Sequence, residues 1–387
     1  MNSKKYNINR FLNILKGIIP SVFSFFCFRK NDQFVFNSEF NKKFNHNSKF
    51  LFEYFISNYP KLKIKFVIND KSLRNELCAM YGDHFITSTK IADIIFIITS
   101  RTWITSSLET PIGGLFLNFN RNVIHLGHGA PIKRIGLNEN YKSKIKYIYY
   151  KIVRTNFSYF LSTSEVFDEN WSRCLGISKD KVFRAPQSRN ISLISGIRPK
   201  SIINNSSKNV LYAPTWRPFS NTKIFPFNDF DLLLLEDFLD VNDMVIYLRI
   251  HPNFESEIDR SILSNRIKIL GRKEIEDIND VLMCFDILIT DYSSIYVDFL
   301  LTNKPIIFLP YDISLYEEVI GLAIDYYKYT PGPKPKNFSD FIHDLKSEID
   351  GTSRYLSDRI EANKILNVIC NDPCKQNARL ILSLIDV

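Results

Sequence analysis

The sequence predicts an α/β protein of two Rossmann-like domains that face each other across a cleft, with helices at the C-terminus. Short apolar runs alternate with helical patterns along almost the whole chain, and such alternation is typical of largely parallel sheets. The length of 387 residues fits two domains of roughly 100–200 residues each. A composition of 45% hydrophobic and 24% charged residues is that of a packed globular protein and excludes disordered and collagen-like classes.

Residues 1–30 form a basic, apolar segment that precedes the first domain. The segment carries six cations and no acidic residue, and its apolar part, residues 18–28, contains Pro20. It is too short to span a membrane, which takes about 20 apolar residues, and it lacks the cleavage site of a secretory signal. It fits a helix lying in the interface of an anionic membrane. A disordered tail or a tail packed on the domain is the alternative.

Residues 31–196 are predicted to form the N-terminal Rossmann-like domain. Helices are expected at 48–58 and 71–80, between apolar runs that read as buried strands. The predicted strands are residues 33–36, 64–68, 94–98, 103–105, 123–126, 159–162 and 182–184.

Residues 197–209 are polar and contain proline, serine and asparagine, which is typical of a linker. Residues 210–387 are then predicted to form a C-terminal Rossmann-like domain that ends in helices. Its strands are expected at 210–213, 244–250, 267–270, 287–290 and 305–309, and its helices at 229–239, 275–284, 294–301, 338–348, 357–370 and 375–385.

The formal net charge of +9 fits a nucleic-acid binder, a partner of anionic membrane or an enzyme for phosphorylated substrates. The cations gather in residues 1–30 and in residues 133–154 rather than along one stripe, so no nucleic-acid partner is expected.

The chain has no G-x-x-x-x-G-K-[ST] loop, no G-x-G-x-x-G and no H-E-x-x-H. Six scattered cysteines indicate a reducing compartment. We therefore expect neither a cofactor nor a metal.

The first candidate loop follows a predicted strand and holds His128 between Gly127 and Gly129. Glycines allow close approach to a ligand, and an imidazole titrates near neutrality, which suits a general base. Lys133, five residues further on, is predicted to bind phosphate. A tight turn with a hydrogen-bonded histidine is the structural alternative.

Two further loops at strand ends carry hydroxyl, guanidinium and imidazole groups. Thr215 and Arg217 follow the first strand of the second domain, where such groups bind phosphate. Arg249 and His251 lie on one side of the next strand by alternation. A cation with an imidazole fits the stabilisation of charge on a transferring phosphoryl group. The alternatives are a core role for Trp216 and a histidine that only caps its strand.

The fourth loop leads from a strand into a helix through Asp291, Ser293 and Ser294. A serine N-cap leaves backbone N–H groups and the positive end of the helix dipole for an anion, which predicts a pyrophosphate site. Asp298, four residues after Ser294, lies on the same helix face. We expect it to accept hydrogen bonds from ligand hydroxyls. An N-cap without a ligand is the structural alternative.

Together the four loops resemble the CDP-glycerol glycerophosphotransferase family of teichoic-acid and capsule synthesis. The similarity runs from Phe34 to Pro333, with Ala130 where the family has threonine and Gly127 where it usually has tryptophan. It implies a GT-B fold with the nucleotide mainly in the second domain, residues 210–387, and the acceptor near the first, residues 31–196. The motifs that carry it are HGAPIK at 128–133, YAPTWR at 212–217, RIHP at 249–252 and TDYSSIYVDF at 290–299.

The resemblance implies transfer of a polyol phosphate, with glycerol phosphate as the first expectation, from a CDP-polyol to a hydroxyl group, releasing CMP. It makes His128 the base on the attacking hydroxyl and His251 a catalytic group at the donor phosphates. The residues then expected to bind the donor are Lys133, Thr215, Arg217, Arg249, Asp291, Ser293, Ser294 and Asp298.

The resemblance also implies partners and a location. The donor would be CDP-glycerol or CDP-ribitol, and the acceptor a lipid-linked glycan in the synthesis of a teichoic acid-like or capsular polymer. The enzyme would sit peripherally on an anionic membrane, at the cytoplasmic face of the cell membrane. Two alternatives stay open: a GT-B glycosyltransferase that uses a nucleotide sugar, and a non-enzymatic binding protein built on the basic patches.

Overall fold

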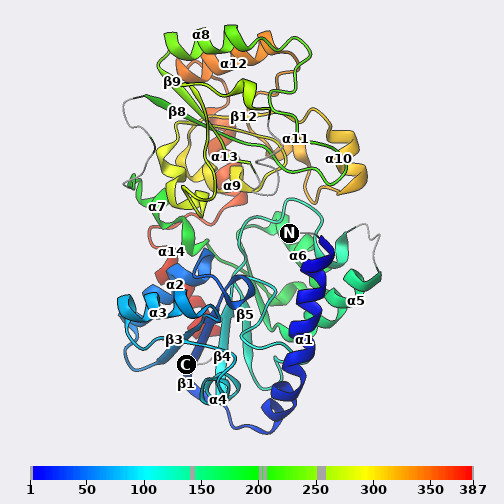
Figure 1. The fold of residues 1–387 in the computed structure, drawn as a ribbon, viewed down its shortest axis with the longest axis vertical. Helices are drawn as coiled ribbons and strands as arrows, with labels where there is room; N and C mark the ends of the chain where they lie inside the picture. Colours follow the sequence, from blue (N-terminus) through cyan, green and yellow to red (C-terminus); the bar gives the residue numbers. More distant parts are fainter. Residues whose placement is uncertain (1–2, 140–143, 200–202, 204–206, 251–258, 386–387) are drawn as a thin grey trace. The chain divides into compact units, whose positions relative to one another are not determined.

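The computed structural model describes residues 3–139, 144–199, 203, 207–250 and 259–385, which are shown in Figure 1. The chain divides into two compact units. Unit 1 comprises Met1–Ala130, Ile135–Ile191 and Cys370–Val387, and unit 2 comprises Pro131–Arg134 and Ser192–Ile369.

Unit 1 is built on a parallel sheet with the strand order β3-β2-β1-β4-β5-β6-β7. Its strands are β1 (Lys30–Asn37), β2 (Lys63–Val67), β3 (Phe85–Ile86), β4 (Ser100–Thr105), β5 (Asn122–His125), β6 (Tyr159–Ser162) and β7 (Val182–Arg184). Its helices are α1 (Ser3–Phe26), α2 (His46–Asn58), α3 (Lys71–Tyr81), α4 (Ile91–Thr99), α5 (Lys144–Val153), α6 (Asp168–Leu175) and α14 (Pro373–Leu384). Short 3₁₀ helices are η1 (Glu39–Asn41), η2 (Gly136–Asn138), η3 (Arg154–Asn156), η4 (Glu165–Phe167), η5 (Lys179–Lys181) and η6 (Ser188–Asn190).

Unit 2 is built on a second parallel sheet with the strand order β10-β9-β8-β11-β12. Its strands are β8 (Lys208–Ala213), β9 (Met244–Leu248), β10 (Ile267–Ile269), β11 (Ile287–Thr290) and β12 (Ile306–Phe308). Its helices are α8 (Leu232–Val241), α9 (Ile295–Phe299), α10 (Ile313–Val319), α11 (Tyr326–Tyr329), α12 (Phe338–Ile349) and α13 (Leu356–Leu366), while α7 (Ile191–Ser195) spans the boundary between the units. Its 3₁₀ helices include η8 (Arg260–Ile262), η9 (Ile278–Cys284) and η10 (Leu300–Thr302). The two parallel sheets confirm the predicted α/β class.

Each sheet has one point at which the chain reverses its direction of strand addition. In unit 1, β2 and β3 lie on one side of β1 and β4 lies on the other. In unit 2, β9 and β10 lie on one side of β8 and β11 lies on the other. Ligands of open α/β sheets bind beyond the carboxyl ends of the strands at such points. The topology therefore directs attention to the loops after β1, β4 and β5, and to those after β8 and β11.

The last helix, α14, belongs to unit 1, whereas the sequence predicted all terminal helices in the second domain. Ala378 and Ile381 are fully buried among the core residues of unit 1. The Asn377 amide donates to Pro186 O and Ser188 Oγ, both at 2.8 Å. Because these contacts bridge almost two hundred residues, local sequence patterns carried no sign of them.

Residues 94–98, predicted as a strand, lie instead inside helix α4. The segment is a run of isoleucines that periodicity alone cannot assign to helix or strand. Ile97 is fully buried, while Ile91 and Ile95, four residues apart, are exposed. The helix therefore buries one side only, against β1 and α1.

Helix α1 packs on unit 1 through a glycine contact. A Cβ on Gly17 would lie 1.9 Å from Gly113 O, so only glycine allows this approach. Ser24 Oγ accepts a hydrogen bond from Nη2 of Arg121, a buried arginine that also binds Ile98 O. Within the described ranges, no helix combines the length and the apolar character needed to cross a membrane.

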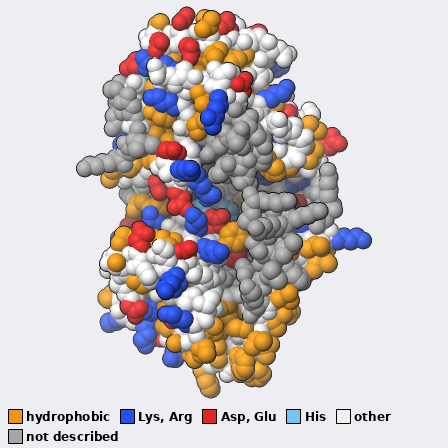
Figure 2. Space-filling view, in the orientation of Figure 1, with side chains coloured by type: hydrophobic (Ala, Val, Ile, Leu, Met, Phe, Trp, Pro, Cys, Tyr) orange, Lys and Arg blue, Asp and Glu red, His pale blue; other side chains and the backbone are white. Residues whose placement is uncertain are grey.

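Helix α1 and its neighbours carry an exposed set of apolar side chains, here called the apolar face. Figure 2 shows hydrophobic side chains gathered at the lower end of the view, where α1 and α4 lie in Figure 1. The Phe25 and Phe119 rings lie 5.4 Å apart and join α1 to the loop before β5. The apolar face comprises Ile19, Val22, Phe23, Phe26, Phe28, Ile91, Ile95, Phe116 and Phe119.

Candidate functional site

His128 lies three residues after β5 and exposes its side chain. Its Nδ1 lies 2.8 Å from the carbonyl oxygen of Ser106. A carbonyl oxygen only accepts hydrogen bonds, so Nδ1 carries the proton, and Nε2 of the neutral ring holds the lone pair. This tautomer is the one that a general base requires.

The carbonyl that orients His128 is itself fixed by helix α2. Ser106 Oγ accepts a 2.8 Å hydrogen bond from Ser48 N and lies 2.8 Å from Ser48 Oγ. Ser48 is in the first turn of α2, which follows β1. The loops after β1, β4 and β5 are thus joined at the reversal point of the unit 1 sheet.

His46 is a second imidazole, next to His128, and no sequence motif indicated it. Its ring centroid lies 5.6 Å from that of His128. Its φ is +56°, which is uncommon for a residue other than glycine. Such backbone conformations cluster at functional sites, but the sequence offered no local sign of this one.

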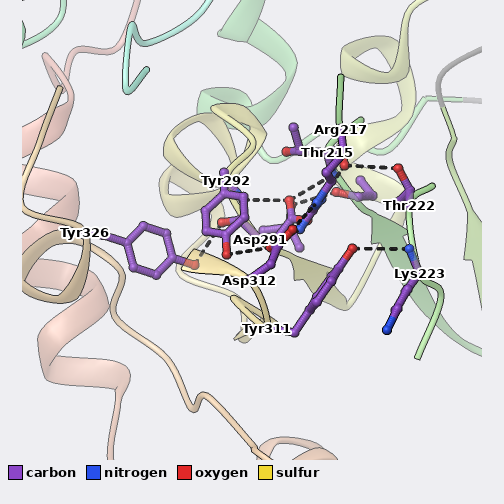
Figure 3. A network of polar contacts seen from close by, with 11 residues as sticks. Thr215, Arg217, Thr222, Lys223, Asp291, Tyr292, Tyr311, Asp312 and Tyr326 are labelled. Atoms are coloured by element: carbon purple, nitrogen blue, oxygen red, sulfur yellow. Dashed lines mark hydrogen bonds and ion pairs between the residues drawn. The ribbon is translucent and has the colours of Figure 1, made fainter. Parts of the chain in front are cut away.

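In unit 2, the loops after β8, β11 and β12 are joined by buried ion pairs around Arg217 (Figure 3). Arg217 Nη1 lies 2.5 Å from Asp291, and Nε and Nη2 donate to Asp312 at 3.0 and 2.8 Å. Tyr292 Oη donates to Asp312 at 3.0 Å, and Tyr326 Oη donates to the Asp291 carbonyl oxygen at 3.0 Å. Backbone N–H of Thr215 donates to Asp291 at 2.8 Å.

Arg217 and Asp291 were predicted to bind substrate, but the structure buries them in this cluster. The guanidinium is fully buried, and Asp291 is 2% exposed. Burial opposes the charge of Arg217, but the Asp312 and Asp291 carboxylates outweigh it and raise its pKa. Both carboxylates are therefore occupied in holding the strand-end loops together.

Backbone hydrogen bonds join the segment around Lys133 to residues 321–323 of unit 2. Lys133 and Leu322 form an antiparallel bridge, Arg134 N donates to Gly321 O, and Ala323 N donates to Ile132 O, both at 2.9 Å. The Lys133 ammonium lies 5.7 Å from the Tyr316 ring centroid. Burial lowers the pKa of Lys133 to about 8, against the attraction of Asp291.

Three hydroxyl side chains flank the reversal point between β8 and β11. Thr215 Oγ1 is buried and has no hydrogen-bond partner within the described residues. Ser293 and Ser294 are partly exposed, and Ser294 precedes α9 without a side-chain capping bond. With five residues, α9 is shorter than the helix predicted from residue 294 to residue 301.

Two of the remaining predicted residues are hydrogen-bonded within unit 2, and the third lies outside the described residues. Asp298 is fully buried, with Asn279 Nδ2 at 3.5 Å, which favours a structural role over contact with ligand hydroxyls. Arg249 donates to Leu270 O and Glu276 O at 3.1 Å. His251 lies outside the described residues.

A pocket of about 470 Å³ lies in unit 2 between residues 327–334 and helix α13. None of the predicted site residues lines it. The described residues contain no group of three or more His, Cys, Asp or Glu side chains that could hold a metal ion. We place the candidate site at the strand ends of each unit, because the predicted polar side chains lie there.

Comparison with known proteins identifies the family of the chain. The family model of the CDP-Glycerol:Poly(glycerophosphate) glycerophosphotransferases matches residues 21–372. The chain belongs to this family. It is therefore a transferase of the glycerophosphotransferase type, as the sequence motifs indicated.

Curated relatives of the family act in teichoic acid synthesis. The chain is 26% identical over 376 residues to a teichoic acid glycerol-phosphate transferase of Staphylococcus aureus, covering 91% of this chain and 93% of the relative. It is 26% identical to a teichoic acid poly(glycerol phosphate) polymerase of Bacillus subtilis, over 82% of this chain but only 44% of the relative. A poly(ribitol-phosphate) polymerase of Bacillus spizizenii is 25% identical over 93% of this chain and 60% of its own length.

Solved structures share the fold. The wall teichoic acid polymerase TagF, in a variant soaked with CDPG, superposes with a TM-score of 0.75 at 18% identity, covering 98% of both chains. A UDP-GlcNAc 2-epimerase from Neisseria meningitidis, bound to UDP-GlcNAc, gives a TM-score of 0.57 at 12% identity over 91% of this chain and 99% of its own. The fold of this chain is accordingly GT-B-like.

Proposed function

We propose that this protein transfers glycerol phosphate from CDP-glycerol to a hydroxyl group of a lipid-linked acceptor and releases CMP, in the synthesis of a teichoic acid-like polymer. The observation that carries the proposal is the orientation of His128. Its Nδ1 is bound to the Ser106 carbonyl, and Nε2 holds the lone pair on an exposed ring. The 93% coverage of the Staphylococcus aureus glycerol-phosphate transferase supports glycerol phosphate as the transferred group.

In the proposed reaction, His128 Nε2 takes the proton of the acceptor hydroxyl as its oxygen attacks the phosphorus that bears glycerol. The bond from that phosphorus to the bridging oxygen breaks, and the bridging oxygen leaves on CMP. We assign the donor phosphates to Lys133, Thr215, Ser293 and Ser294, and we assign Arg249 and His251 to the same phosphates as the resemblance implies. The Arg217, Asp291 and Asp312 cluster is proposed to hold the loops that carry these groups.

The test measures the release of CMP from CDP-glycerol and from CDP-ribitol, and the release of UMP or UDP from UDP-glucose. Each donor is offered with a lipid-linked acceptor. We expect release from CDP-glycerol that requires the acceptor and exceeds that from CDP-ribitol. Turnover of UDP-glucose alone would move the assignment to a glycosyltransferase. Faster turnover of CDP-ribitol would keep the chemistry and change the polyol.

We further propose that the protein works on the cytoplasmic face of an anionic membrane, to which the apolar face binds. Phe23, Phe26 and Phe28 are 64%, 83% and 94% exposed, and they precede the cations Arg29 and Lys30. Exposed aromatic side chains next to cations are typical of segments that lie in the interface of acidic bilayers. A lipid-linked acceptor would be reached from such a position.

Co-sedimentation with vesicles tests this location. We expect binding to vesicles containing phosphatidylglycerol, weaker binding to pure phosphatidylcholine, and loss of binding in the Phe23→Ser, Phe26→Ser double variant. Val241→Ser is the matched control, since Val241 is 85% exposed on unit 2. Equal binding by the double variant and by the control would contradict the proposal.

A further inference from the structure

His125 lies at the end of β5, three residues before His128, and has no assigned role. Its side chain is fully buried, and its Nδ1 accepts the backbone N–H of Gly127 at 2.9 Å. Because Nδ1 is the acceptor, the proton of the neutral ring is on Nε2. This tautomer is the opposite of the one at His128.

The N–H that His125 accepts belongs to Gly127, the residue directly before His128. Gly127 has a φ of +69°, a left-handed conformation that glycine adopts without strain. On the other side of the same residue, Asn47 Nδ2 donates to Gly127 O at 2.9 Å. Asn47 is fixed in turn, because its Oδ1 accepts the backbone N–H of Arg189 at 3.0 Å. Both the N–H and the carbonyl oxygen of Gly127 are therefore hydrogen-bonded to side chains.

The surroundings of His125 would suit a hydrocarbon ring better than an imidazole. The ring stacks on Phe160 at 4.9 Å between centroids, with Phe157 at 5.5 Å and Trp171 at 5.7 Å. Its Nε2 is buried and has no hydrogen-bond partner within the described residues. An unpaired N–H in such a place is unfavourable, so packing alone does not account for a histidine here.

We propose that His125 is a positioning residue for His128. With Asn47, it fixes the turn at Gly127 so that the His128 ring meets the Ser106 carbonyl and presents Nε2. Burial, and then the neighbouring His128, lower the pKa of His125 to about 3. The ring is therefore a neutral acceptor at neutral pH. The inference rests on the proposed function, in which His128 is the base.

Two substitutions separate positioning from packing. His125→Phe fills the space beside Phe157, Phe160 and Trp171 and removes the unpaired Nε2–H. It also removes the acceptor for the Gly127 N–H. We expect kcat to fall on the order of 10²-fold, as for a displaced catalytic group, while the KM for the donor and the melting temperature stay near wild type. His125→Asn keeps an oxygen acceptor near the place of Nδ1 but leaves a void. We expect kcat to recover to within about tenfold of wild type, since part of the positioning is restored, with a lower melting temperature.

His125→Phe is thus expected to have the lower turnover and the higher melting temperature of the two variants. His125→Asn is expected to have the higher turnover and the lower melting temperature. His84→Phe is the control, because His84 is a partly buried histidine whose Nδ1 lies 2.9 Å from Ile64 O, outside the His128 loop. Its kcat should match that of wild type. A His125→Phe enzyme with wild-type kcat, or kcat values that simply follow melting temperature, would overturn the proposal.

Hydrogen exchange of the Gly127 amide tests the same bond without an activity assay. We expect slow exchange in wild type and in His125→Asn, and fast exchange in His125→Phe. Fast exchange in wild type would overturn the role of His125. If wild type turns over no CDP-polyol, the proposed function fails, while the amide exchange still decides whether His125 holds the turn.

Discussion

The predicted site residues at the reversal points of the two sheets differ in exposure. In unit 1, His128 is exposed and is oriented by a backbone carbonyl, with buried Ser48 and Asn47 beneath. In unit 2, Arg217 and Asp291 are buried and bind each other. A charged residue at a strand end can therefore act on a ligand only if its charge is not already used inside the fold, as those of Arg217 and Asp291 are. The residue type and the motif do not reveal which case applies.

The sharpest way to break this comparison is to remove the exposed imidazole. His128→Gln should lower CMP release by about 10²–10⁴-fold, the usual contribution of a general base. Its melting temperature should stay at the wild-type value, because the side chain is exposed. A rate assay with thermal unfolding of the same sample checks both. Wild-type turnover would remove His128 from the mechanism.

Removing the buried cation should instead lower the stability of the fold. Arg217→Met leaves Asp291 and Asp312 without their partner, and breaking a buried ion pair on one side costs about 3–5 kcal/mol of unfolding free energy. Urea unfolding measures it. Arg266→Met is the matched control, since Arg266 also binds two aspartates, Asp240 and Asp243, but on the surface. We expect a far smaller loss there, and equal losses would contradict the structural role of Arg217.

The pH dependence of donor binding sharpens the role of Lys133, whose pKa of about 8 lies below its ordinary 10.5. Binding of CDP-glycerol should weaken about tenfold as the pH rises through 8, since the ammonium loses its proton and a charge-assisted hydrogen bond is lost. Lys133→Met should bind weakly at every pH. Without donor, wild type should gain stability between pH 8 and 10.5, because the unfolded chain then holds more protons. Titration calorimetry from pH 7 to 9 checks the binding, and a flat wild-type profile would contradict it.

The smallest expected effect is at Thr215, whose buried Oγ1 lacks a partner within the described residues. Thr215→Val should weaken donor binding by about threefold to tenfold, the worth of one hydrogen bond. The melting temperature should stay the same or rise, because an unpaired hydroxyl is replaced by a methyl group. Unchanged donor affinity would place Thr215 outside the donor site.

The fold was largely predictable because buried parallel strands read as apolar runs between helical patterns. The errors were at α4, where an isoleucine run fits either element, and at α14, whose contacts with Pro186 and Ser188 are distant in sequence. The two-residue strand β3 was also missed, being too short to form a pattern.

The site was predictable as a set of strand-end loops but not in its division of roles. Arg217 and Asp291 stand in motifs that suit phosphate binding, and only their mutual contact shows that their charges are used internally. His125 and His46 gave no sign in sequence, since their roles depend on a buried hydrogen bond and on a positive φ.

The most direct test of the account is titration of CDP-glycerol into the His128→Gln and Lys133→Met proteins, followed on the same samples by CMP release with acceptor. The account predicts that His128→Gln binds the donor like wild type yet releases almost no CMP, while Lys133→Met binds the donor more weakly. Loss of donor binding in His128→Gln, with wild-type binding in Lys133→Met, would contradict the assignment of base and donor site to different units.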